Sequence, residues 1–130
     1  MTTATNTPTI RGFHAHVYFD AATRGIAEQV HAALARHFGV ALGAPRERPI
    51  GPHPKGMFQV SIGPEEFATV VPWLMIHRSG LSVLVHPVTD DSVADHDTHP
   101  LWMGERLPID VDVIRRHLRK KESRHQHPIP

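Results

Sequence analysis

The chain has 130 residues, the length of one domain, and its 40% hydrophobic and 21% charged residues are those of an ordinary globular protein. Its formal net charge of +1 provides no strong field for nucleic acid or an anionic membrane, and the absence of cysteine excludes disulfides, thiolate metal sites and a cysteine nucleophile. No apolar run is long enough to span a bilayer, and residues 1–9 lack the features of a signal peptide. We therefore expect a cytoplasmic protein that binds neither nucleic acid nor membrane.

The first half of the chain predicts three strands and one helix. Residues 1–10 are predicted to be a disordered leader, and residues 13–19 alternate apolar and polar side chains, which is typical of a strand. Apolar residues at helical spacing predict a helix over 21–38, with Asp20 as its N-cap and Gly39 just beyond its end. Residues 40–50 favour an edge strand interrupted by prolines, and residues 57–62 a regular strand.

The second half begins with a predicted helix over 65–79, which Pro72 is expected to kink or interrupt. A strand over 81–86 follows and is stopped by Pro87. Residues 88–109 are interpreted as a long loop, residues 110–119 as a short helix, and residues 120–130 as a basic flexible tail.

This order predicts an α+β fold of the ferredoxin-like type, β-α-β-β-α-β, in one domain over residues 11–119. We expect a four-stranded antiparallel sheet with helices on one face, plus the long C-terminal loop and short helix. The period-two strands support this plan, because such a sheet buries only one of its faces.

Histidine is the unusual residue, with twelve in the chain. We interpret His117, His125 and His127 as solvated residues in or near the basic tail. We expect the first and third strands to be parallel, so that the start of strand one, the turn between strands two and three, and the end of strand four meet. That end of the polar sheet face would then gather His14, His16, His53 and His86. Three imidazoles with open coordination positions are typical of a catalytic zinc or iron site.

Each of these residues also has a purely structural interpretation. His14 and His16 fit a surface or dimer interface, His53 a turn between prolines, and His86 the end of a strand. In the long loop, Asp95 and His96 fit either an acid/base pair or a solvated loop. Trp102 fits either a lid over a flat aromatic substrate or packing against the sheet.

Four blocks in this order carry a resemblance to a known family. They are Phe13-His14-Ala15-His16-Val17-Tyr18-Phe19, Gly51-Pro52-His53-Pro54 with Met57-Phe58, Leu81-Ser82-Val83-Leu84-Val85-His86-Pro87, and Asp95-His96 with Trp102-Met103-Gly104. Together they resemble the DOPA 4,5-dioxygenase family over most of the chain, and their common order makes the resemblance specific.

The resemblance implies extradiol cleavage, of the 4,5 type, of a catechol such as DOPA by O2, a reaction of aromatic compound catabolism, with non-haem Fe(II) as cofactor. On this basis we assign His16, His53 and His86 as metal ligands, and His14 and His96 as catalytic acid/base residues. The roles of His14 and His16 are interchangeable at this stage. The substrate would be contacted by Tyr18, Gln59 and Trp102.

Two other classes remain open. Zinc on the same histidines could serve a hydrolase instead, and zinc or another divalent metal could also occupy the site in purified protein. A non-catalytic dimeric binding module would use the open sheet face as its interface. Gln59 and Ser82 on that face favour the dioxygenase, because they suit a site better than an apolar interface. A homodimer is expected in any of these cases, because an open antiparallel face favours a partner.

Overall fold

The computed structural model describes residues 7–126 of the chain, with side chains placed up to Glu122. The predictions for residues 1–6, residues 127–130 and the side chain of His125 therefore lie outside the described residues. The strands are β1 (Gly12–Phe19), β2 (Ala41–Leu42), β3 (Gly56–Ile62), β4 (Val83–Val88) and β5 (Leu101–Met103). The helices are α1 (Arg24–His37), the short 3-10 helix η2 (Pro64–Glu66), α2 (Phe67–His77), α3 (Ser92–Asp97) and α4 (Val111–Gln126).

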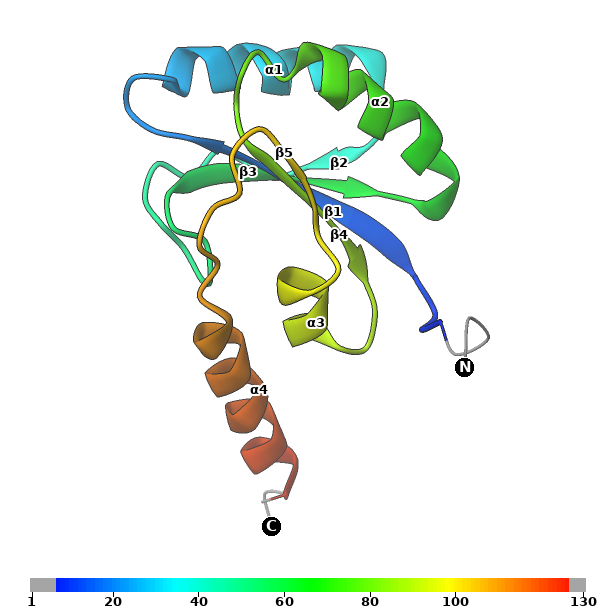
Figure 1. Ribbon diagram of the computed structural model, residues 1–130, viewed down its shortest axis with the longest axis vertical. Helices are drawn as coiled ribbons and strands as arrows, with labels where there is room; N and C mark the ends of the chain where they lie inside the picture. Colours follow the sequence, from blue (N-terminus) through cyan, green and yellow to red (C-terminus); the bar gives the residue numbers. More distant parts are fainter. Residues whose placement is uncertain (1–6, 127–130) are drawn as a thin grey trace.

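The strands form one antiparallel sheet in the order β2-β3-β1-β4-β5 (Figure 1). β1 is central and pairs with β3 on one side and β4 on the other, which explains why Ala15 and Val17 are completely buried. The order β1, α1, β2, β3, α2, β4 along the chain is the one that the sequence predicts.

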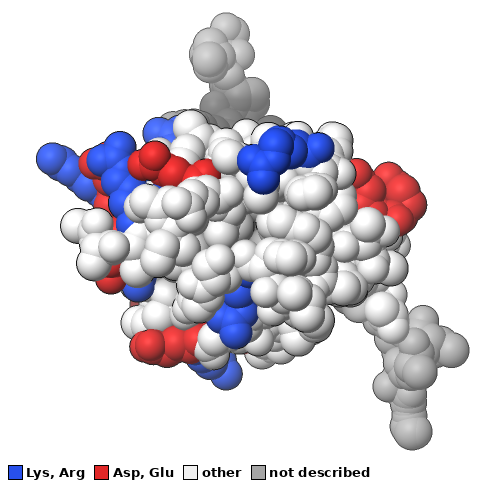
Figure 2. Space-filling model, turned by 90° about the horizontal axis from the view of Figure 1, so that it is seen from above, with Lys and Arg blue, Asp and Glu red and all other residues white. Residues whose placement is uncertain are grey.

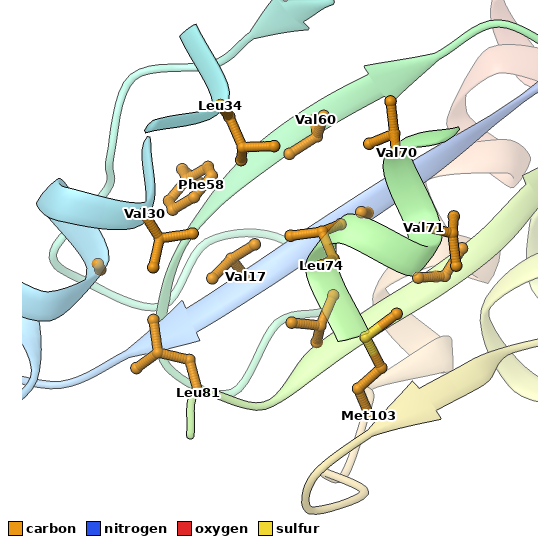
Figure 3. Close-up of a cluster of buried hydrophobic side chains, with 14 of the residues drawn as sticks. Val17, Val30, Leu34, Phe58, Val60, Val70, Val71, Leu74, Leu81 and Met103 are labelled. Carbon is orange, nitrogen blue, oxygen red and sulfur yellow. The ribbon is translucent and has the colours of Figure 1, made fainter. Parts of the chain in front are cut away.

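The main core lies between the sheet and the helices α1 and α2 (Figure 3). Val17 of β1 and Phe58 of β3 meet Leu34 of α1 and Leu74 of α2, and all four are fully buried. These residues come from the alternating and helical patterns, so the patterns identify the face of the sheet that is packed. The opposite face carries the histidines.

The strand directions differ from our expectation. β3 is antiparallel to β1, and β2 is antiparallel to β3, so β1 is parallel to β2 and not to β3. The physical reason is that a helical crossover joins parallel strands, whereas a direct connection such as that from β2 to β3 reverses the chain. The β2–β3 connection therefore lies at the end of the sheet opposite to the start of β1.

The long loop that we expected over 88–109 was wrong, because it contains α3 and the edge strand β5. Asp91 begins α3 by accepting a hydrogen bond from the backbone N–H of Ala94. β5 adds to β4 and extends the sheet beyond the predicted four strands. Both elements are too short, at six and three residues, to show a periodic pattern.

Proline positions explain two further differences. Pro87 lies inside β4, at a point where β5 no longer pairs with that strand, and such an edge position tolerates proline. Pro72 lies inside α2, and the helix continues on both sides of it. The first helix begins at Arg24, later than predicted, and in the turn before it the Asp20 carboxylate accepts hydrogen bonds from the Thr23 N–H and hydroxyl.

Helices cover both faces of the sheet, and not one face as predicted. Figure 1 shows α1 and α2 above the sheet and α3 and α4 below it. α4 continues to Gln126, past the predicted end at residue 119. On the α1 and α2 side, Figure 2 shows charged residues of both signs mainly near the edges of the view. Within the described residues, no helix combines the length and apolarity needed to cross a membrane.

Candidate metal centre

Three histidines of the central strands form a compact group on the face opposite α1 and α2. His14 of β1 is directly opposite His86 of β4 in the strand register, and His16 follows on the same face of β1. One ring nitrogen from each lies within 4.8 Å of those of the other two. The shortest distance, 3.1 Å, joins Nε2 of His16 to Nε2 of His86. The group holds two of the three predicted ligands, His16 and His86, together with His14.

His53 reaches the same place by a route that the sequence analysis did not foresee. His53 lies in the connection between β2 and β3, which starts at the end of the sheet opposite to the start of β1. This connection folds back over the open face, where the Pro52 carbonyl accepts a hydrogen bond from the Asp110 N–H. The His53 ring then lies 4.2 Å from the His16 ring, centre to centre. Its Nδ1 is hydrogen-bonded to the Tyr18 hydroxyl at 2.8 Å.

His96 approaches from α3, with its ring centre 4.2 Å from that of His86. Its Nδ1 donates a hydrogen bond to the Ser92 carbonyl, and Nδ1 of His86 donates to the Pro87 carbonyl, both at 2.7 Å. A carbonyl oxygen only accepts, so in each ring Nδ1 carries the proton. In the neutral form, Nε2 of both rings therefore presents a lone pair.

Burial favours the uncharged form of the histidines on β1 and β4 and of His53. Burial, with His53 and His86 nearby, lowers the pKa of His16 well below its usual value. Burial, with His96 nearby, also lowers the pKa of His53 and of His86 to about 4. The pKa of His14 is lowered for the same reasons, although the nearby Asp95 opposes this shift. Neutral imidazole is the form that binds a metal.

The donor set fits a divalent transition metal. Two nitrogen ligands that each lie about 2.1 Å from one ion are about 3.0 to 3.4 Å apart, which matches the His16–His86 separation. Without a metal, His16 would donate from Nε2 to His86 and leave its buried Nδ1 as an acceptor that has no partner among the described residues. Imidazole ligands suit zinc, iron, copper and nickel, so the set does not by itself select the metal.

A cavity of about 400 Å³ opens beside these residues. His14, His16, His53 and His96 line it together with Gln59 of β3. α4 supplies the facing wall through Val113, Ile114 and His117, and Figure 1 shows this helix on the same side of the sheet as α3. The cavity provides room for a small organic molecule beside the histidines.

Of the three residues predicted to contact the substrate, only one lines the cavity. Gln59 lines the cavity, whereas Trp102 stacks on Tyr18 at a ring distance of 6.0 Å and is outside the lining. Trp102 packs there with Leu84, Leu107 and Ile109 in a second apolar cluster. Tyr18 is buried and reaches the site through its bond to His53. Substrate contact by Tyr18 and Trp102 stays a prediction.

Asp95 stands next to His96 in the sequence but has a different place. Its carboxylate is buried and accepts hydrogen bonds from the Thr89 backbone N–H and hydroxyl, at 2.8 and 2.6 Å. These bonds fasten α3 to the segment that follows β4. Asp95 thus positions the helix that carries His96.

Sequence reasoning missed the contribution of α4. We interpreted His117 as a solvated residue near a basic tail, and the structure places it at the border of the cavity. The available signal was its spacing from Val113 and Ile114, since residues three and four apart share one face of a helix.

Known proteins resemble this chain in sequence and in fold. The model of the Dopa 4,5-dioxygenase family matches residues 13–113. The chain belongs to this family. It is 33% identical over 111 residues to a DOPA 4,5-dioxygenase of Amanita muscaria, covering 78% of this chain and 49% of that protein. It is 44% identical over 87 residues to an uncharacterised 21.2 kDa protein of Botryotinia fuckeliana, covering 61% and 47%.

A solved structure shares the fold of this family member. It is a crystal structure at 1.46 Å of a candidate dioxygenase from Nostoc punctiforme, with 52% identity and a TM-score of 0.81. The match covers 83% of this chain and 94% of the other. The two fungal relatives are longer, and the chain spans about half of their length.

Proposed function

We propose that this protein is an extradiol dioxygenase that opens the ring of a catechol with O2, using a metal held by histidines. One observation carries the proposal: the ring nitrogens of His14, His16 and His86 lie within 4.8 Å of one another beside a cavity of about 400 Å³. Membership in the DOPA 4,5-dioxygenase family supports the reaction class. The substrate type, the Fe(II) cofactor and the cleavage position are parts of the proposal.

We assign His14, His16 and His86 as metal ligands, which differs from the set His16, His53 and His86 in the sequence analysis. The support is the mutual distance of the three nitrogens, within 4.8 Å of one another. When bound, Fe(II) supplies the redox centre at which a catechol and O2 react. The remaining coordination positions are left for these two substrates.

The proposed acid/base residues are His53 and His96. Nδ1 of His96 is a donor to Ser92, so its Nε2 is free to take a proton from a catechol hydroxyl. His53 has the same capacity when its Nδ1 donates to the Tyr18 oxygen. Burial raises the pKa of Tyr18, so its hydroxyl stays protonated and holds the ring of His53 in place.

The test is O2 consumption by protein that has been loaded with Fe(II) under anaerobic conditions. DOPA, caffeate and protocatechuate form the first panel, and the visible spectrum is recorded in parallel. O2 uptake together with a new yellow absorbance is the expected result. Iron that is demonstrably bound, with no uptake on any catechol, would contradict ring cleavage, and tightly held zinc would then favour the hydrolase.

Three further expectations remain proposals. The first four strands with α1 and α2 form a ferredoxin-like unit, to which β5, α3 and α4 are added; the sheet order β2-β3-β1-β4 supports this interpretation. A cytoplasmic location is the second. The third is a homodimer, although α3 and α4 take up part of the sheet face from which we expected it.

A further inference from the structure

The cavity has a buried end and an exposed end, and different residues form them. His16 and His53 are only 2% and 7% exposed, whereas His117 of α4 is exposed and borders the same cavity. Val113 and Ile114 provide apolar wall next to His117. A catechol whose hydroxyls lie at the buried histidines therefore directs its ring substituent toward α4.

The described residues that line the cavity supply no negative charge. Among the described residues that line it, five are histidines and none is Asp or Glu. The nearby carboxylates are engaged elsewhere, since Asp95 accepts bonds from Thr89 and Asp112 pairs with Arg115. An ammonium group on the substrate would lose water without gaining an anionic partner, which is unfavourable. A carboxylate would instead meet the imidazole of His117, which can donate an N–H.

We propose that His117 selects catechols that carry an acidic side chain, by donating a hydrogen bond to the substrate carboxylate at the cavity mouth. This inference rests on the proposed function and names its substrate class. Val113 and Ile114 contact the carbon chain between the ring and the acid. The preferred substrate is therefore a catechol joined to a carboxylate by a short apolar spacer, and catecholamines are disfavoured.

Equilibrium binding tests this selection apart from turnover. The protein is loaded with zinc, which cannot carry out the oxidation, and titrated anaerobically with 3-(3,4-dihydroxyphenyl)propanoate, with its primary amide and with dopamine. We expect the acid to bind about five- to tenfold more tightly than the amide, the range that one hydrogen bond to a charged group supports at an exposed position. Dopamine should bind more weakly than the amide.

Two variants locate the effect. His117→Ala should reduce the affinity for the acid to that for the amide and leave the affinity for the amide unchanged. Arg119→Gln is the matched control, because residues two positions apart lie about 200° apart around a helix, so position 119 faces away from the cavity. This control removes a positive charge from α4 and should keep the preference for the acid.

The outcomes separate the inference from the proposed function. Equal affinity for the three ligands, or a preference for the acid that survives in His117→Ala, overturns the role of His117 even where the Fe(II) protein cleaves catechols. Selective binding of the acid without O2 uptake by the Fe(II) protein upholds the selection and rejects ring cleavage. Failure of metal-loaded protein to bind any catechol overturns both.

Discussion

Nε2 of His16 and Nε2 of His86 face each other at 3.1 Å, although 70 residues separate them in the chain. β1 and β4 are neighbours in the sheet, so the backbone fixes this separation and the ligands need little rearrangement when a metal binds. We expect His16→Ala to weaken metal binding by more than about 100-fold, since even partners outside the ligand set contribute about 10- to 100-fold. Metal analysis after dialysis measures the effect. His77→Ala on α2 is the control and should retain full metal.

The two proposed ligand sets share His16 and His86 and differ in the third ligand, which is His14 in one set and His53 in the other. We expect His14→Ala to lose metal and His53→Ala to keep it while losing turnover, because the nitrogens of His14, His16 and His86 lie within 4.8 Å of one another. Metal content and O2 uptake, measured on the same preparations, check this prediction. Loss of metal from His53→Ala with full retention in His14→Ala would restore the set predicted from sequence.

Tyr18→Phe should reduce turnover and leave the metal content unchanged. The substitution removes only the hydroxyl that holds His53 at 2.8 Å, so the ring is free to leave its orientation. We expect a loss of about 1 to 2 kcal/mol in stability, because a buried hydrogen-bond partner is removed. Steady-state kinetics and thermal unfolding measure the two effects. Unchanged kcat in Tyr18→Phe would remove Tyr18 from the mechanism.

The metal-free protein should lose stability as the pH falls from about 6.5 to about 4. The pKa of His53 and of His86 is about 4 in the folded state, so in this window the unfolded chain binds more protons at both positions. Proton uptake then favours unfolding, and the contribution of these two groups is complete below about pH 4. We expect Tm of chelator-treated protein to fall by more than roughly 5 °C between pH 7 and pH 5.

A variant at His53 tests whether this histidine contributes to the pH dependence of stability. His53→Gln removes one group with a lowered pKa, so the slope of unfolding free energy against pH should decrease by close to one proton between pH 5 and pH 6. A Tm that does not change over this range in the parent protein would show that these histidines are not held in the neutral state.

The sequence predicted the elements whose patterns span several turns or strands. Val17 and Phe58 lie in the core as their alternation indicates, and the polar face of β1 carries His14 and His16. The four predicted histidines do gather, but the expected reason was wrong for His53. Its position depends on a connection that folds back over the sheet, and no local pattern in residues 43–55 encodes that path.

The remainder of the site depends on tertiary contacts. His96 reaches His86 because Asp95 and Thr89 fasten α3, and this bond joins residues whose pairing has no periodic signal. His117 belongs to α4, a helix that continues beyond its predicted end. We interpreted His117 as solvated, whereas it lines the cavity. In both cases the sequence shows that the residue is a histidine, but its neighbours depend on tertiary packing and could not be predicted.

Gly56 offers a test of the connection that delivers His53. A Cβ at this position would lie 2.7 Å from the carbonyl oxygen of Arg46 and 2.9 Å from that of Glu47, both of which are backbone atoms. Gly56→Ala should therefore push residues 43–55 away from β3 and destabilise the protein by about 1 to 3 kcal/mol. Because His53 moves with this connection, turnover should fall, while a metal bound by His14, His16 and His86 is retained.

Gly39→Ala is the matched control for Gly56→Ala, since a Cβ at position 39 meets no atom within 4 Å. It should leave both turnover and metal content unchanged. The comparison is made by thermal unfolding, metal analysis and O2 uptake on all three proteins. If Gly56→Ala loses its metal together with its activity, the connection supplies a ligand, and His53 returns to the metal site. If Gly56→Ala keeps full activity, the placement of His53 does not depend on this close backbone contact.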